Sequence, residues 1–157
     1  MTVDDPLAPH AHEPNPLPPS PDAGLVLHLP DGAARCISPA ELRSLDSVTV
    51  PRCYIVSTGH GTSGPFSFTG VRLRDFVEQH WPGAWTQVEV VSGDGFGTRA
   101  SRAELTVPTT RPALLAHTRD RRPLTRADGL VRLIVPGEID DALRQVKWVA
   151  HVRILAA

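Results

Sequence analysis

The chain has 157 residues, a length that fits one domain with a substantial core. Its 16 Lys and Arg nearly balance its 17 Asp and Glu, and the resulting net charge of -1 excludes the basic surplus typical of nucleic-acid-binding proteins. No apolar stretch approaches the roughly 18 residues of a membrane-spanning helix, and residues 1–5 lack the features of a secretory signal, so we expect a cytoplasmic protein that contacts no membrane.

Residues 1–22 are rich in proline and show no apolar periodicity, which predicts a disordered or extended tail. The folded domain is expected over residues 23–157, and it should begin with an apolar strand over residues 25–29. The segment 38–41, Ser-Pro-Ala-Glu, is a capping box with proline at the first helical position. It predicts a helix over residues 39–45.

A second apolar strand is predicted over residues 48–56, with Pro51 marking an edge or a bulge, because proline cannot donate to a strand ladder. This strand runs into a loop of glycines and hydroxyl side chains over residues 57–64. Glycines let backbone N–H groups approach an anion closely, so the loop is the first candidate for a ligand site. A turn that binds no ligand is the alternative interpretation.

Strands and short helices alternate irregularly along the rest of the chain. Apolar spacing over residues 73–81 predicts a helix, and alternation over residues 146–154 predicts a last strand with one clean apolar face. The remaining predicted segments are strands at 66–71, 86–91, 112–117 and 131–135, a second glycine loop at 92–99, a helical turn from Ser101 and a polar turn at 120–124. Without a strict βαβ rhythm, this order favours an α+β domain with a mixed β-sheet and short helices.

Four segments, in this order, resemble the molybdopterin-binding domain of the sulfite oxidase family. They are Ser38–Leu42, Phe68–Phe76, the Asp-Gly-Tyr-like loop Ser92–Phe96, and the closing stretch Leu114–Val149. The resemblance covers roughly residues 24–155. It implies a sulfite oxidase-type fold, a molybdopterin or molybdenum cofactor, and an oxidoreductase that acts on a small molecule.

The resemblance also places the active site at the two glycine loops. Together with the side-chain chemistry of these loops, it makes His60, Asp94 and Ser57 the candidate catalytic residues. Further candidates would bind the cofactor, and cationic groups before the last strand are expected near its phosphate. These cofactor-binding candidates are Thr58, Gly59, Gly61, Thr62, Phe96, Arg99, Arg144 and Lys147.

Each candidate also has a simpler structural interpretation. His60 could be a solvated side chain on a surface turn, and Asp94 could cap its own glycine-rich turn, as aspartate often does. Arg144 and Lys147 could be solvated charges at a helix end and a strand. The sequence leaves these alternatives open.

The chain differs from the family pattern at the positions that bind the cofactor and its molybdenum. The N-terminal part that supplies several cofactor contacts in the family is missing or replaced by the proline-rich tail. The family's molybdenum-binding cysteine aligns with Ser57, whose hydroxyl is a poor substitute for a thiolate. Cys53 is the remaining candidate metal ligand, and Phe96 replaces the tyrosine of the family's Asp-Gly-Tyr loop.

Two functions of different classes remain. The first is an oxidoreductase that uses molybdenum cofactor. The second is a metal-free scaffold, without a cofactor, in which His60, Asp94 or the hydroxyls of Ser57 and Thr58 perform acid–base chemistry such as cyclisation, isomerisation or dehydration of an organic substrate. A ligand-binding accessory protein is a variant of the second. Each function involves a small molecule, and the sequence indicates neither the oligomeric state nor a redox partner.

Overall fold

The computed structural model describes residues 24–57, 61–136 and 145–156. Its elements, in chain order, are β1 (Leu25–His28), β2 (Ala34–Ile37), α1 (Pro39–Ser44), β3 (Val48–Ser57), β4 (Gly61–Arg72), α2 (Leu73–His80), β5 (Gln87–Ser92), β6 (Gly97–Ser101), α3 (Arg102–Leu105), β7 (Leu114–Arg119), β8 (Arg122–Pro123), β9 (Arg132–Ile134) and β10 (Val149–Leu155). Within the described ranges, no helix is long and apolar enough to cross a membrane. The predicted tail, residues 1–22, lies outside them.

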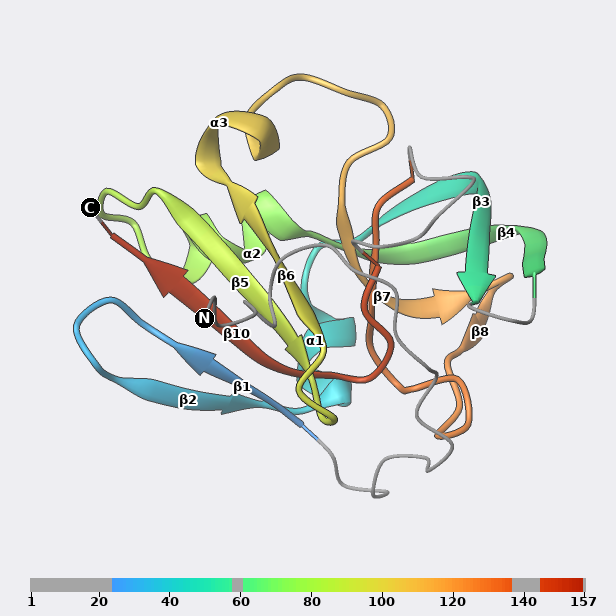
Figure 1. Ribbon diagram of the computed structural model, residues 1–157, viewed down its shortest axis with the longest axis horizontal. Helices are drawn as coiled ribbons and strands as arrows, with labels where there is room; N and C mark the ends of the chain where they lie inside the picture. Colours follow the sequence, from blue (N-terminus) through green and yellow to red (C-terminus); the bar gives the residue numbers. More distant parts are fainter. Residues whose placement is uncertain (1–23, 58–60, 137–144, 157) are drawn as a thin grey trace, which may run out of the picture.

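The strands form two five-stranded sheets (Figure 1). The first sheet has the order β2-β1-β10-β5-β6, and the second has the order β3-β4-β7-β8, with β9 also paired to β7. In Figure 1 the first sheet lies on the left and the second on the right. Strands β1 and β10 are parallel, whereas β10 and β5 are antiparallel, so the first sheet is mixed. The α+β class with a mixed sheet is therefore confirmed.

The second sheet carries apolar side chains on both of its faces, because alternate residues of a strand point to opposite sides. On β7, Leu115 packs into the first core, which also contains the inner face of the first sheet together with α1 and α2. Its neighbours Leu114 and Ala116 pack into a second core on the opposite face, with Cys53 and Phe68. The second sheet thus separates the first core from the second core, and a side chain on this sheet faces one core or the other according to its position in the strand.

The helix predictions rest on local signals and are confirmed. The Ser38 side chain accepts a hydrogen bond from the Glu41 N–H at the start of α1. At α3, Ser101 and Glu104 form a complete capping box, in which each side chain binds the other residue's backbone N–H. Such bonds satisfy donors that a helix cannot satisfy internally, so the sequence alone defines where these helices begin.

The edge or bulge predicted at Pro51 is also confirmed. Strand β3 is at the edge of the second sheet, and its pairing with β4 shifts register between Val50 and Cys53. Arg52, inside this shift, has a φ of 56°. Arg111 stabilises the bulge because its guanidinium donates hydrogen bonds to the carbonyl oxygens of Pro51 and Arg52, at 2.7 and 3.0 Å.

Other boundaries were predicted wrongly. The first glycine loop is shorter than expected, because residues 61–64 already belong to β4 and pair with β3. Residues 34–37 form β2, which the sequence analysis missed because they are mostly exposed and show no apolar alternation. The clean apolar face expected over residues 146–154 is interrupted by a register shift between Val149 and His151, so Val149 is buried in place of Ala150.

His117 on β7 provides a pH-dependent test of this fold. Its ring nitrogens lie 2.9 Å from the Ser47 hydroxyl and 2.7 Å from the Thr118 hydroxyl. Burial, with a smaller contribution from Arg43, lowers the pKa of His117 below its ordinary value of 6.5. Its contribution to stability is therefore complete above pH 6.5 and is lost as the pH falls toward the lower folded-state pKa, because the unfolded chain then binds the proton more readily. Urea unfolding across this range should be less pH-dependent in His117→Gln than in the wild-type chain, and equal pH dependence would contradict this assignment.

Candidate functional site

The first candidate loop is only partly within the described residues. Thr58, Gly59 and His60 lie outside them, as does Arg144. The backbones of Ser57 and Gly61 pair with one another at the ends of β3 and β4, and Thr62 pairs with Val56 one position further along. The predicted roles of these residues therefore remain predictions.

Asp94 lies at the turn between β5 and β6. Its carboxylate accepts a hydrogen bond from the Phe96 N–H at 3.1 Å, and its own N–H lies 3.4 Å from the Ser92 hydroxyl. This is the turn-capping arrangement that was one of the two interpretations from the sequence. Phe96 is partly buried and packs against the first core.

Arg99 belongs to a strand and not to the second glycine loop, whereas its predicted role in cofactor binding stays a prediction. It belongs to β6, directly opposite Glu89 of β5. Its Nε donates a hydrogen bond of 2.9 Å to the Glu89 carboxylate. A loop was predicted here because glycine and threonine are common in loops, but Gly97 and Thr98 pair with β5 and so belong to a strand.

Cys53 points into the second core, and its side chain is fully buried. Its thiol donates a hydrogen bond to the Val50 carbonyl oxygen at 3.3 Å. Burial raises the pKa of the Cys53 thiol, although the nearby Arg111 opposes this effect. Metal ligation requires a thiolate, so this placement does not suit a metal ligand.

The two thiols should consequently differ in reactivity. Cys36 is exposed on β2, so it should react with a disulfide reagent within minutes at about pH 8, while Cys53 should react only after denaturation. A colorimetric thiol assay before and after addition of guanidinium measures both. In Cys36→Ser the rapid reaction should disappear. A rapid reaction of Cys53 in the folded chain would show that the second core is open to solvent.

A cluster of cationic side chains lies on the second-core side of the second sheet. We call Arg119, Arg132 and Lys147 the basic cluster. Arg119 is opposite Phe68 on β4, and its guanidinium lies 5.0 Å from the centre of the Phe66 ring. Arg132 alternates with Leu133 on β9 and so shares the face of Ile134, which packs into the second core.

One carboxylate, Asp128, holds part of this cluster in place. It pairs with Arg119 at 3.5 Å and accepts a hydrogen bond from the Thr125 hydroxyl at 2.9 Å. The Arg132 guanidinium donates to the Asp128 backbone carbonyl oxygen at 3.4 Å. Asp128 therefore contacts Arg119 through its carboxylate and Arg132 through its backbone carbonyl oxygen.

Desolvation has the largest effect on the pKa values of Arg132 and Lys147. It lowers the pKa of Arg132 to about 10, an effect that Asp128 opposes and Arg119 reinforces. It also lowers the pKa of Lys147, with a further contribution from Arg132. A pKa near 10 still leaves Arg132 charged at neutral pH, so the site holds a desolvated cation that an anionic ligand would stabilise.

The segment that carries Lys147 is tied to β3 by its neighbour Gln145. The Gln145 side-chain amide donates to the Tyr54 carbonyl oxygen at 3.1 Å, while its own Oε1 is buried and has no hydrogen-bond partner among the described residues. Lys147 itself packs beside Gly129, where a Cβ would lie 3.0 Å from the lysine Cγ. A buried hydrogen-bond acceptor without a partner, Gln145 Oε1, therefore lies two residues before Lys147 of the basic cluster.

Lys147 was predicted from the sequence as a cofactor-binding residue, whereas Arg119, Asp128 and Arg132 were not. A charged residue inside the apolar run Val131–Val135 was the available signal, because charges are rarely placed in buried strands without a partner. Arg119 had no such signal, since only sheet pairing brings it to Phe66.

The described residues do not form a metal centre. No group of three or more His, Cys, Asp or Glu side chains within them is placed to hold a metal ion.

Comparisons with known proteins concern the family and the fold of this chain. Residues 35–157 match the family model described as the oxidoreductase molybdopterin binding domain. The sulfane dehydrogenase SoxCD from Paracoccus pantotrophus has a similar fold, with a TM-score of 0.64 and 17% sequence identity over 85% of this chain. The match spans 38% of the SoxCD chain, so this chain corresponds to little more than a third of that protein's length. A search of curated protein sequences found no significant match.

The family match covers most of the chain, residues 35–157. The resemblance drawn from the four sequence segments is thereby confirmed. This chain belongs to the oxidoreductase molybdopterin binding domain family.

Proposed function

We propose that this chain binds a phosphate-bearing pterin of the molybdopterin class at the basic cluster and takes part in an oxidoreductase reaction on a small molecule. The position of Arg132 is the observation that carries the proposal: it lies opposite Ala116 of β7 on the face of the second core, and its guanidinium donates to the Asp128 carbonyl oxygen at 3.4 Å. A phosphate accepts hydrogen bonds from planar guanidinium groups in a bidentate manner, which matches this donor set.

The buried acceptor supports a pterin in particular. Gln145 Oε1 has no partner among the described residues, and a pterin ring carries N–H donors that could satisfy it. Phosphate contacts at Arg132 and Lys147 would fix one end of the cofactor, and Gln145 would orient its ring.

The protein ligand to molybdenum does not fit as well. Cys53 is inside the second core, and Ser57 stands where the resemblance expects the metal-binding cysteine. A molybdenum cofactor supplies redox chemistry when it is bound. This chain's own residues would bind and orient the organic part, without a thiolate bond to the metal from Cys53.

The metal-free alternative remains a second candidate because of this same mismatch. In that case the site would bind an organic substrate, and His60, Asp94 or Ser57 would move protons. The buried position of the Cys53 thiol is the specific observation that favours it.

The test is to express the full chain in a host that makes molybdenum cofactor and to analyse the purified protein. Oxidative release followed by pterin fluorescence measures the organic part, and mass spectrometry measures molybdenum. We expect about one pterin per chain.

The two measurements distinguish the candidates. Pterin together with molybdenum would support the redox function. Pterin without molybdenum would support binding of the organic cofactor and would contradict a molybdenum-dependent redox reaction. Absence of pterin from a chain purified from a competent host would overturn the proposal and favour the metal-free scaffold.

A further inference from the structure

Two histidine side chains meet on the outer face of the first sheet. His28 is the last residue of β1, and His151 lies on the neighbouring parallel strand β10. The Nε2 of His28 lies 3.0 Å from the Nδ1 of His151, and the two ring centroids are 5.3 Å apart. Their chain neighbours Leu27 and Val152 belong to the first core, so the alternation of each strand places both rings on the opposite face.

The pair lies where the β1–β2 hairpin joins the rest of the first sheet (Figure 1). Strand β2 is the edge strand and pairs with β1, and β1 pairs with β10 over three residues. The hairpin also contributes three buried side chains to the first core, Leu25, Leu27 and Ile37. Strand pairs fray most easily at their ends, so the contact of His28 with His151 holds this end of the hairpin against β10.

The hydrogen bond depends on the number of protons that the two rings carry. Between two neutral imidazoles, an N–H donates to the lone pair of the facing nitrogen. One added proton keeps this bond, because a charged ring can donate to a neutral one. A second proton removes the last acceptor, since both facing nitrogens then carry an N–H group. The contact therefore changes from a hydrogen bond to a repulsion between two cations when the second proton binds.

The charged groups on the neighbouring strands of this face do not relieve that repulsion. Arg153 of β10 lies opposite His28 and adds a further cation. Glu89 of β5 lies opposite Arg153, and its carboxylate is 4.0 Å from the Arg153 guanidinium. The same carboxylate accepts a hydrogen bond of 2.9 Å from Arg99 of β6. The carboxylate on this face is thus shared by two arginines.

The hairpin itself offers no free carboxylate to the pair among the described residues. The Asp31 carboxylate, in the turn after β1, accepts the Ala33 N–H at 2.9 Å. Arg35 of β2 lies opposite Leu27 and pairs with Glu41 at 2.6 Å. The exposed thiol on β2, that of Cys36, lies opposite Val26.

These surroundings disfavour the charged form of His151. Burial has the largest effect, and Arg153 and then His28 add to it, so the pKa of His151 lies below its ordinary value of 6.5. The unfolded chain has the higher pKa and binds the proton more readily. The contribution of His151 to stability is therefore complete above pH 6.5 and is lost as the pH falls toward the folded-state pKa.

We propose that the His28–His151 pair is a proton-controlled latch for the β1–β2 hairpin. At neutral pH its hydrogen bond holds the hairpin against β10. When both rings are protonated, their repulsion favours a state in which the hairpin detaches while the other strands of the first sheet stay folded. Detachment uncovers the side chains that the hairpin buries, so the chain gains an exposed apolar surface in acid. The latch is independent of the proposed function.

Native-state hydrogen exchange followed by NMR measures the opening of the hairpin in the full chain. Protection of the β1 and β2 amides, corrected for the intrinsic exchange rate, should fall between about pH 7.5 and pH 5.5. It should fall about tenfold more than protection of the β5 amides, because a factor of ten corresponds to one unit of pKa. A dye that fluoresces on apolar surfaces should bind more strongly over the same range.

Two variants remove the titrating rings one at a time. In His151→Gln and in His28→Gln, the additional pH dependence of the β1 and β2 amides should disappear. In His28→Gln the pKa of His151, measured from its ring signals, should also rise, because the charge of His28 no longer opposes protonation. A purely structural role of His28 would leave that pKa unchanged.

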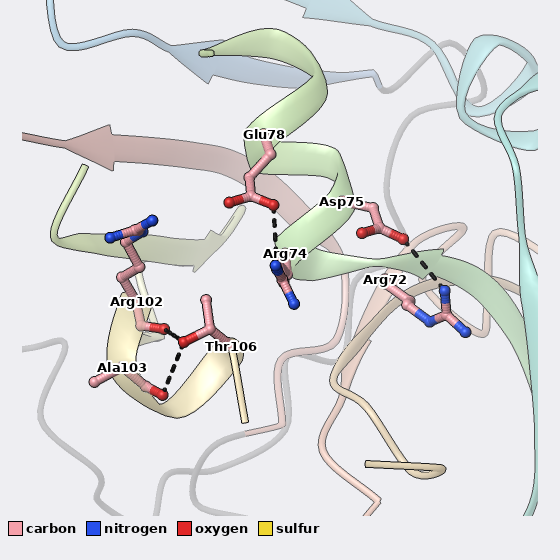
Figure 2. A network of polar contacts seen from close by, with 7 residues as sticks. All are labelled: Arg72, Arg74, Asp75, Glu78, Arg102, Ala103 and Thr106. Atoms are coloured by element: carbon pink, nitrogen blue, oxygen red, sulfur yellow. Dashed lines mark hydrogen bonds and ion pairs between the residues drawn. The ribbon is translucent and has the colours of Figure 1, made fainter. Parts of the chain in front are cut away.

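His80 on α2 provides the matched control. Figure 2 shows this helix with its Arg74–Glu78 ion pair. The Nδ1–H of His80 donates to the Phe76 carbonyl oxygen at 2.8 Å, so protonation of the other ring nitrogen leaves this bond in place. His80→Gln should therefore keep the wild-type pH dependence of the hairpin amides.

Three outcomes would overturn the latch. The first is equal pH dependence of hairpin protection in His151→Gln and the wild-type chain. The second is a parallel loss of protection in β1 and β5, which would indicate global unfolding, and the third is an equal effect of His80→Gln and His151→Gln. If His151→Gln does not fold, ring signals of the wild-type chain decide the question. The pair should titrate in two successive steps, and two identical, independent titrations would contradict the proposal.

Discussion

Replacing Arg132 by glutamine should lower the pterin content of the purified chain by about tenfold or more. A hydrogen bond between charged groups contributes about 1.5–3 kcal/mol, which corresponds to a factor of roughly 10 to 150 in affinity. The effect should be at the upper end, because desolvation strengthens an interaction between Arg132 and a phosphate. Pterin fluorescence after oxidative release measures the retained cofactor.

Two further variants control this experiment. Arg132→Lys keeps the charge but loses the planar fork, so it should retain an intermediate amount of pterin. Arg35→Gln removes an exposed arginine that pairs with Glu41 on another part of the surface, and it should retain the wild-type amount. Thermal unfolding of each variant shows whether the chain is folded. Equal pterin content in Arg132→Gln and Arg35→Gln would remove the basic cluster from the site.

Replacing Gly70 by alanine should destabilise the fold by about 3 kcal/mol or more. Gly70 lies on β4 where β7 approaches most closely, and a Cβ there would lie 2.6 Å from the Ala116 Cα and in collision with the Leu115 carbonyl oxygen. Both obstacles are backbone atoms, so the strands must separate or shift register to make room. Urea unfolding monitored by circular dichroism measures the loss.

Gly32 offers a matched control for this substitution. It has a φ of 91° in the turn between β1 and β2, and a Cβ there would have no atom within 4 Å. Gly32→Ala therefore incurs only backbone strain, about 1–2 kcal/mol. If the two variants unfold at the same urea concentration, the close approach of β4 and β7 at Gly70 is not the cause of the destabilisation.

The predictions for Arg132 and Gly70 both involve strand β7. Arg119 and Leu115 both lie on β7, where Leu115 packs into the first core and Arg119 belongs to the basic cluster. A shift of β7 in Gly70→Ala should therefore also reduce pterin retention, although Gly70 contacts no ligand in our proposal. The second sheet acts as a partition, with the proposed pterin site on the face of the second core and the first core on the other face.

Much of the fold could be predicted from local sequence. The capping residues Ser38 and Ser101 place the starts of α1 and α3, because each side chain binds a backbone N–H within three residues. Helical spacing gives α2, in which Leu73, Phe76 and Val77 are buried as the pattern requires. Family membership was also accessible, since the motifs that carry it are contiguous in the chain.

The candidate site was less accessible. Arg99 looked like a loop residue because strand pairing, which the sequence does not display, determines that it faces Glu89. Cys53 looked like a metal ligand because it is the only cysteine near the glycine loop, yet its face depends on a bulge at Arg52. A one-residue shift of register reverses every side chain that follows, so small irregularities decide which groups meet.

The sequence by itself determined the capped helices, the apolar strands, the α+β class and the family. Each of these depends on residues a few positions apart or on contiguous motifs. Only the tertiary structure decided that Arg119, Arg132 and Lys147 gather on one face of the second sheet and that His28 meets His151 on the first sheet. Those groups come from separate strands and loops, and their proximity results from sheet pairing and bulges that no local pattern encodes.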